Sequence, residues 1–289
     1  MPSSHDAGLA GCFPYVSGQV RFVQDGWDSL VVLLDQRWIA RIPRTPSTAA
    51  RAVTEFALLD LLAERLPVAV PEPVATCREH GAMLYPRIPG RPLAAVADDS
   101  HAQRLATLLA NALESLHRTP LDRARTIGVL DLSGTGWGDA YREKCDQFRA
   151  RVVPLLPEPE RVAGRALLDR LVERASDPTI AGTLVHRDLG PAHVLCADGL
   201  LTGIIDWTDA CIGDPAIDLA WALHGSATPL SHALQDALQV DDDMAGQSLL
   251  YHQLGPWFEV VHGFDHGSDK LVTSGLHGVL DRLSLPFRP

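Results

Sequence analysis

The sequence predicts an α+β protein with a small β-rich N-terminal lobe and a larger α-helical C-terminal lobe. Three observations predict this class. Strand-like runs fill the first part of the chain, helical periodicity dominates its second half, and a proline- and glycine-rich connector, "YPRIPGRPL", separates the two regions near residue 88. We therefore expect the lobes to cover residues 1–88 and 89–289.

The N-terminal lobe is predicted to hold a small antiparallel sheet followed by one helix. The strand signals are "QVRFV", "SLVVLLD" and "RWIARIP", which are rich in β-branched and aromatic residues and are separated by short polar turns. The helix signal is "TAARAVTEFALLDLLAERL", in which apolar residues recur at helical spacing after a cap at Ser47 or Thr48. Prolines in "LPVAVPEPV" end that helix, and "GAMLY" predicts one more strand.

The C-terminal lobe is predicted to be mainly helical. The segment "QRLATLLANALESLH" places its leucines on one face, which indicates an amphipathic helix, and residues 161–176 are predicted to form another. Between these helices and the helical C-terminal region, "AHVLC" and "TGIIDW" read as two short buried strands joined by the turn "ADGL".

Composition excludes several classes of protein. The 289 residues carry a net charge of −11, which argues against sequence-independent nucleic-acid binding and suits a cationic partner. The longest apolar runs are too short to cross a bilayer, and no signal-peptide pattern opens the chain, so we expect a cytoplasmic protein without a membrane partner, either a monomer or a homodimer. The five cysteines form no CxxC pair, so neither a disulfide framework nor a zinc knuckle is expected.

The chemistry is concentrated in "LVHRDLGPAHVLCADGLLTGIIDW", residues 184–207. Asp188 is expected on the loop before the paired strands and Asp206 at the end of the second strand, so their carboxylates can converge. A single aspartate in such a place usually caps a turn, but the joint spacing indicates more. Phosphoryl transfer from a nucleotide needs one carboxylate to orient the acceptor hydroxyl and another to hold Mg²⁺.

At this point the sequence resembles a known family. The segments "HRDLGPAHVL" and "GIIDW" are similar to the catalytic and metal loops of the aminoglycoside and macrolide phosphotransferases, antibiotic kinases with a protein-kinase-like fold. The resemblance extends through "WIARIPR", "VTEFALLDLL", "YPRIPGRPL" and "GDPAIDLAWAL", and the C-terminal tail is similar to the last helices of aminoglycoside 2″-phosphotransferases.

The resemblance implies a bilobal kinase-like fold with a nucleotide-binding lobe over 1–88 and a catalytic and substrate-binding lobe over 89–289. It also implies ATP or GTP as phosphate donor, Asp188 as catalytic base, and Asp206 as a ligand of Mg²⁺. His186 and Asp218 are expected to brace the catalytic loop.

Two departures from the family pattern bear on the metal and the phosphates. His193 stands where the family usually has a metal-binding asparagine, and histidine at this position is found in macrolide phosphotransferases; it is either a metal ligand or a packed loop residue. The chain has only two lysines, both outside the N-terminal lobe, so Arg41 matches the phosphate-anchoring lysine. Glu55 matches its partner, although the two could instead form a surface ion pair.

The remaining nucleotide contacts are expected around a turn and the connector. Ser29 ends the turn "QDGWDS", which is neither a G-x-G-x-x-G loop nor a Walker sequence, and it is expected to meet a phosphate. Tyr85, Arg87 and Ile88 in "LYPRI" are expected to contact the base through their backbone.

Substrate contacts follow from the segments that line the cleft in the family. Acidic residues there would bind an aminoglycoside, and aromatic residues would favour a macrolide. The acidic set is Asp209, Glu259, Asp265 and Asp269, and the aromatic set is Trp207, Trp257 and Phe258. His262 and His266 have a spacing that zinc sites use, but they lack the accompanying HExxH glutamate, so we expect no zinc there.

The resulting prediction is a kinase that phosphorylates a hydroxyl of a small, cationic antibiotic and so inactivates it. Two alternatives stay open at this stage. One is a kinase for a metabolite alcohol such as choline, homoserine or a sugar. The other is a ligand-binding pseudokinase, suggested by the missing lysine and asparagine.

Overall fold

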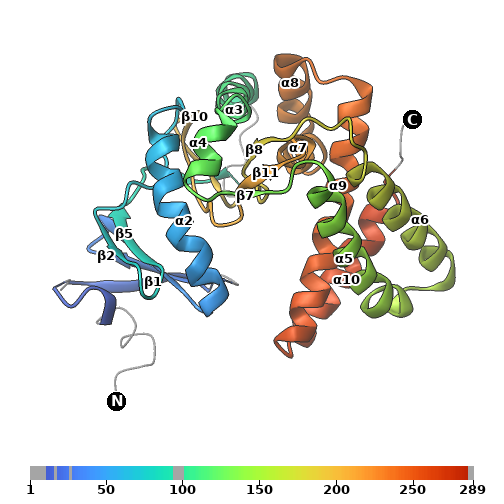
Figure 1. Ribbon diagram of the computed structural model, residues 1–289, viewed down its shortest axis with the longest axis horizontal. Coiled ribbons are helices and arrows are strands. Elements are labelled where there is room, and N and C mark those ends of the chain that lie inside the picture. The colour runs from blue at the N-terminus through green and yellow to red at the C-terminus, as the bar shows by residue number, and fades with distance from the viewer. Residues whose placement is uncertain (1–10, 16–17, 26–27, 94–100, 286–289) are drawn as a thin grey trace. The chain divides into compact units, whose positions relative to one another are not determined.

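The computed structural model describes residues 11–15, 18–25, 28–93 and 101–285, and it divides the chain into two compact units. The first unit combines residues 1–130 with the returning segment 191–210, and the second combines residues 131–190 with 211–289. The first unit combines antiparallel sheets with helices and the second is mainly helical, so the α+β class is confirmed (Figure 1). These two units have their boundaries at other residues than 88, and the lobe boundary expected there stays a prediction.

Five strands form the main sheet of the first unit, in the order β1-β2-β3-β5-β4 with every neighbouring pair antiparallel. They are β1 (Val20–Asp25), β2 (Ser29–Leu34), β3 (Trp38–Pro43), β4 (Ala75–Cys77) and β5 (Ala82–Pro86). The core under this sheet is made of alternate strand residues such as Val32 and Ala40, together with Phe13 from the N-terminal segment. Strands β1 to β3 confirm the three strand signals of the sequence.

Helix α2 (Pro46–Ala63) follows β3 and packs beside the sheet (Figure 1). Its N-cap is Thr45, whose hydroxyl accepts a hydrogen bond from the amide of Thr48 at 3.2 Å. The cap predicted at Ser47 or Thr48 is therefore wrong by two or three residues. Pro46 explains the shift, because its fixed φ suits the first helical position and lets the helix begin earlier.

The rest of the first unit consists of two helices and a second, three-stranded sheet with the strand order β10-β9-β6. Its elements are β6 (Arg91–Pro92), α3 (Ala102–His117), α4 (Leu121–Thr126), β9 (Val194–Ala197) and β10 (Leu200–Ile204). Strands β9 and β10 form the predicted hairpin, with Val194 opposite Ile204. Ile204 is buried and ends the strand, two residues before Asp206.

The second unit is mainly helical. Its helices are α5 (Thr135–Arg151), a 3₁₀ turn (Val153–Leu155), α6 (Glu158–Ala175), α7 (Ala216–His224), α8 (Thr228–Leu238), α9 (Asp242–Asp265) and α10 (Asp269–Leu283). A small sheet of β7 (Leu130–Asp131), β11 (Cys211–Gly213) and β8 (Thr183–Val185) lies against them. Helices α9 and α10 run side by side (Figure 1). Trp137, Phe148 and Trp257 are among the large aromatic side chains of this unit's core. Within the described residues, none of the helices has the length and apolarity needed to cross a membrane.

Candidate active site

The first unit places a buried cation, Arg41, between two carboxylates. Arg41 projects from the middle of β3 and is only 4% exposed. Its Nη1 donates to Glu55 Oε1 of α2 and to Asp206 Oδ1, both at 3.0 Å, and its Nη2 forms a second bond with Glu55. Glu55 is 2% exposed, so the alternative of a surface ion pair is excluded.

Burial and charge act against each other in this cluster. Burial alone would lower the pKa of Arg41, but the neighbouring carboxylates of Glu55 and Asp206 outweigh it and raise that pKa. Burial raises the pKa of Glu55, and the guanidinium of Arg41 opposes the rise. The nearby phenol of Tyr85 also has a raised pKa because it is buried. Arg41 therefore keeps its positive charge in this buried position.

Thr208 is a member of this cluster that sequence reasoning missed. Its hydroxyl donates to Glu55 Oε2 at 3.0 Å, lies 3.2 Å from Asp206 Oδ1 and also contacts Arg41 Nη2. The backbone N–H of Trp207 adds a bond to Glu55 Oε1 at 3.2 Å. The segment 206–208 is thus fastened to α2 through one glutamate. No sequence pattern distinguishes a single threonine after "DW" as a member of a buried charge cluster.

Asp206 combines an unusual backbone with a half-exposed carboxylate. Its φ is +67°, in the left-handed region that most residues avoid. Its Oδ2 lies 3.8 Å from Nε2 of His193, which precedes β9, and the Asp206 side chain is 46% exposed. Backbone strain of this kind persists where the surrounding structure imposes it, and it is common at functional sites.

These two side chains fit a divalent cation through different donor types. A carboxylate oxygen is the ligand that Mg²⁺ prefers, whereas an imidazole nitrogen suits softer metals better. Asp206 would therefore be the main ligand of Mg²⁺ and His193 the weaker one.

The second unit contains the loop that carries Asp188, which is exposed. The buried carboxylate of Asp218, at the start of α7, accepts the backbone N–H groups of His186 at 3.0 Å and Arg187 at 2.9 Å. Nδ1 of His186 lies 3.3 Å from the backbone nitrogen of Asp188. Arg187 has φ +71°, a further strained position. His186 and Asp218 therefore hold the backbone of this loop, as the resemblance implied.

A buried chain of hydrogen bonds lies next to this loop in the same unit. Trp137 Nε1 donates to the Tyr251 hydroxyl at 2.7 Å, which donates to Asp214 Oδ2 at 2.8 Å. Asp214 also accepts the amide of Ala216 at 3.0 Å, and its burial raises its pKa. This network fixes the "GDPAID" segment that delivers Asp218.

The predicted nucleotide contacts lie in the first unit. Ser29 and Ile88 are buried, whereas Arg87 is exposed. The backbone N–H of Arg87 donates to the carbonyl of Arg37 at 2.7 Å and so extends the pairing of β3 with β5. This amide is therefore used inside the sheet, and contacts to a base from this connector would come from neighbouring peptide groups.

The aromatic part of the predicted substrate set needs correction. Trp257 is 0% exposed, and its indole packs against Phe148 and the backbone at Gly164 in the core of the second unit. A side chain without exposed surface cannot contact a substrate, so the prediction of Trp257 as a substrate contact is wrong. Trp207 is likewise 1% exposed and donates to the carbonyl of Ile204 at 3.0 Å. Phe258 keeps an exposed ring.

The acidic part of that set is at the surface and partly paired. Asp209, in the first unit, lies 3.4 Å from Arg51. Asp265, at the end of α9, accepts a 2.6 Å bond from Arg151, which lowers the pKa of Asp265. Glu259 is half-buried on α9. The site predictions for these acids, and the convergence of Asp188 with Asp206, stay predictions.

Comparison with solved structures places the fold. The chain is similar to a structure of APH(2")-IIia with GDP and kanamycin, at 23% identity and a TM-score of 0.84, covering 96% of this chain and 97% of the other. It is also similar to a macrolide 2'-phosphotransferase type I, at 22% identity and a TM-score of 0.76, covering 96% and 98% of the two chains. The chain therefore has the protein-kinase-like fold of these enzymes, as the sequence predicted.

Sequence comparison gives the family. The sequence model of the phosphotransferase enzyme family (APH) matches residues 19–256, and the chain belongs to that family. The viomycin phosphotransferase of Streptomyces vinaceus is 27% identical over 194 residues, which are 56% of this chain and 64% of that protein. The matches span less than two thirds of the length of the curated relatives.

Proposed function

We propose that this protein transfers the γ-phosphate of ATP or GTP to a hydroxyl group of a small, cationic antibiotic and thereby inactivates it. Family membership supports phosphoryl transfer as the reaction. The names of related proteins, which include viomycin and aminoglycoside phosphotransferases, support an antibiotic as the acceptor.

The observation that carries the proposal is the buried Arg41–Glu55 pair joined to Asp206. Phosphoryl transfer depends on positioning and charge neutralisation, so a phosphate-binding cation needs a fixed place beside the metal-binding carboxylate. Glu55 gives Arg41 that place, and Arg41 Nη1 reaches Asp206 at 3.0 Å. To contact a phosphate, Nη1 of Arg41 would give up its hydrogen bond to Asp206 and donate to a phosphate oxygen instead. Glu55 would keep its bonds to the guanidinium.

Asp188 is the proposed catalytic base. Asp218 holds the backbone of its loop, and the Asp188 side chain is exposed to solvent. A catalytic base needs this exposure because the substrate hydroxyl must reach it. Asp188 would orient the acceptor and accept its proton. Mg²⁺, held by Asp206 with His193, would neutralise charge on the phosphates when bound.

The buried tryptophans favour a polycationic acceptor over a macrolide. A macrolide offers one amine and a large apolar ring, which needs exposed aromatic surface. Of the three aromatic residues proposed for that ring, only Phe258 is exposed. The acids Asp209, Glu259 and Asp265 suit the several ammonium groups of an aminoglycoside.

The test is a nucleotide-release assay with a panel of aminoglycosides, macrolides and metabolite alcohols. We expect turnover with an aminoglycoside, and Asp188→Asn should reduce kcat by at least ~100-fold, the scale of a lost general base, with little change in nucleotide affinity. Asp198→Asn is the matched control, since Asp198 is an exposed aspartate in the β9–β10 turn and asparagine tolerates its φ of +51°.

Two outcomes would contradict the proposal. Turnover confined to metabolite alcohols would assign the chain to metabolism, and nucleotide binding without turnover of any acceptor would make it a pseudokinase. Near-normal turnover by Asp188→Asn would remove Asp188 from its proposed role.

A further inference from the structure

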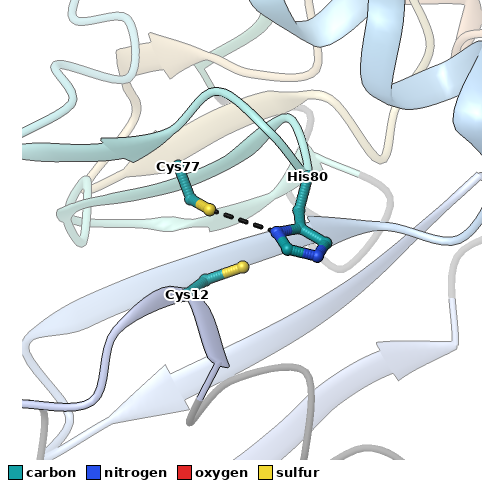
Figure 2. Close-up of side chains that lie close together, drawn as sticks. All are labelled: Cys12, Cys77 and His80. Atoms are coloured by element: carbon teal, nitrogen blue, oxygen red, sulfur yellow. Dashed lines mark hydrogen bonds between the residues drawn. The ribbon is translucent and has the colours of Figure 1, made fainter.

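Three potential metal ligands that the proposed phosphotransfer does not use meet in the first unit. They are Cys12, Cys77 and His80, and their thiol and imidazole ligand atoms all lie within 4.8 Å of one another (Figure 2). Among the described residues this is the one group of three or more histidine, cysteine or acidic side chains with such spacing. The sequence alone did not indicate it, because Cys12 and Cys77 are far apart in the chain.

A tight turn brings Cys77 and His80 together. Cys77 ends β4 opposite Ala82 of β5, and the amide of His80 donates to the Cys77 carbonyl at 3.2 Å. Gly81 completes the turn with φ +62°, and a Cβ there would lie 2.6 Å from the carbonyl oxygen of Ala49. The turn therefore aims Nδ1 of His80 at Sγ of Cys77, 3.3 Å away.

Cys12 is held in place by its neighbour Phe13. Phe13 is 1% exposed and belongs to the core cluster under the main sheet, and Cys12 and Cys77 both pack against that cluster. Because the Phe13 ring is anchored, the preceding residue has a defined position. Figure 2 shows the Cys12 sulfur directed toward the other two side chains.

The ligand types and distances select a thiophilic cation. Zinc binds thiolate sulfur at about 2.3 Å and imidazole nitrogen at about 2.0–2.1 Å in tetrahedral geometry, so neighbouring ligands lie roughly 3.6 Å apart. The observed separation of 3.3 Å between Cys77 and His80 is close to that value. Magnesium and calcium prefer oxygen and do not suit this set.

We propose that Cys12, Cys77 and His80 bind one zinc ion and so fasten the N-terminal segment to the turn between β4 and β5. His80 is exposed, so solvent can supply the fourth ligand. The ion would stabilise the folded chain, since a metal that binds only the folded state shifts the folding equilibrium toward it. The proposal does not depend on the phosphotransfer reaction.

The experiment uses the full chain without a histidine tag, stripped of metal and kept reduced. Titration with Co²⁺ should give one equivalent of binding with a thiolate-to-cobalt charge-transfer band, and Zn²⁺ should displace the cobalt and raise the Tm. His80→Gln and Cys77→Ser should each weaken binding at least ~10-fold and remove the zinc-dependent rise in Tm. The controls are His117→Gln and Cys196→Ser, which remove the same groups elsewhere in the unit.

Three results would overturn the zinc site. One is the absence of a thiolate–cobalt band in the reduced protein. Another is unchanged affinity in His80→Gln, which decides the matter even if Cys77→Ser folds poorly, because His80 lies at an exposed turn. The third is a disulfide between Cys12 and Cys77 that withstands the reductant, since it would leave no thiolate to bind a metal.

Discussion

At Arg41 a guanidinium stands where the resemblance to antibiotic kinases expects a lysine, and its shape changes what the position can do. A lysine ammonium is a point charge, whereas the planar guanidinium offers donors in two directions. Arg41 uses them to hold both carboxylate oxygens of Glu55 while also reaching Asp206. One side chain therefore links strand β3, helix α2 and the segment that carries Asp206.

Removing this cation should destabilise the protein by leaving a buried acid unpaired. We expect Arg41→Met to lower the free energy of unfolding by about 3–5 kcal/mol, the cost of breaking a buried ion pair. Adding Glu55→Gln should restore at least half of that loss, because it removes the stranded charge and keeps an acceptor for the Trp207 amide. Calorimetric titration should find weakened nucleotide binding in both variants, since neither has the cation.

Arg51→Met is the control for that comparison. Arg51 is also an arginine paired with an aspartate, 2.9 Å from Asp28, but its side chain is 47% exposed. Its loss should therefore cost less than about 1 kcal/mol. Equal losses from Arg41→Met and Arg51→Met, measured by urea unfolding, would show that the buried pair contributes no more than a surface one.

The sequence indicated some residues of this cluster and not others for physical reasons. Arg41 and Glu55 were predicted because they stand at the positions where the resemblance to antibiotic kinases implies the phosphate-anchoring cation and its partner. Thr208 could not, since a hydroxyl side chain fits many environments. Trp257 was assigned to the substrate because indoles occur both at binding surfaces and in cores, and only packing distinguishes the two.

At the scale of elements, helix α10 supplies a hydrogen-bond donor that helix α9 lacks. Pro256 lies inside α9 and has no N–H to donate to the carbonyl four residues earlier, at His252. Nη1 of Arg282, from α10, donates to that carbonyl instead. The side-chain amide of Gln253, in α9, donates a hydrogen bond to the backbone carbonyl of Arg282 at 2.9 Å. The two helices are therefore joined where α9 is interrupted.

A double-mutant cycle should reveal this substitution of donors. Arg282→Met leaves the His252 carbonyl without its donor and should cost about 1–3 kcal/mol of unfolding free energy. In a Pro256→Ala background the same change should cost less than half as much, because alanine has the backbone N–H that proline lacks. Thermal unfolding measures each term, and Lys270→Met, an exposed cation on α10, is the control. Additive losses would mean that Arg282 acts elsewhere.

Elements with a strong local pattern were predicted correctly, and features that depend on distant contacts were not. Strands β1 to β3 and helices α2 and α3 follow from periodicity, so their positions could be predicted closely. The Cys12–Cys77–His80 cluster could not be predicted, because nothing local reports which segment packs over a turn. The wrong cap of α2 has a local cause, since Pro46 allowed a start that apolar spacing does not reveal.

At the scale of the whole molecule, neither compact unit is a continuous piece of chain. The segment that resembles the catalytic and metal loops of antibiotic kinases is itself divided, with Asp188 in the second unit and Asp206 in the first. The first unit needs the hairpin β9–β10 to hold its Arg41 cluster, because Asp206, Trp207 and Thr208 follow directly on that hairpin. A fragment that ended at residue 130 would lack the contacts that these residues make to Glu55 and Arg41.

The free energy of unfolding should depend on pH because a histidine is buried in the second unit. His252 is 7% exposed, and its burial, together with the charges of Arg282 and His224, lowers its pKa to about 3 from an ordinary value near 6.5. Between these two pH values the unfolded chain binds a proton that the folded chain does not. The free energy of unfolding must therefore fall as pH drops below about 6.5.

We expect this loss to reach about 1.4 kcal/mol per pH unit for the one proton of His252. Burial also lowers the pKa of His224, which acts in the same direction. His252→Gln removes the titrating group, so its unfolding free energy should decline less steeply between pH 6.5 and pH 4, as measured by urea unfolding at several pH values. The control is His277→Gln, at an exposed position of α10, which should keep the original slope. Parallel pH profiles for the original protein and His252→Gln would contradict the assignment, because they would show that His252 takes up its proton equally in the folded and unfolded chains.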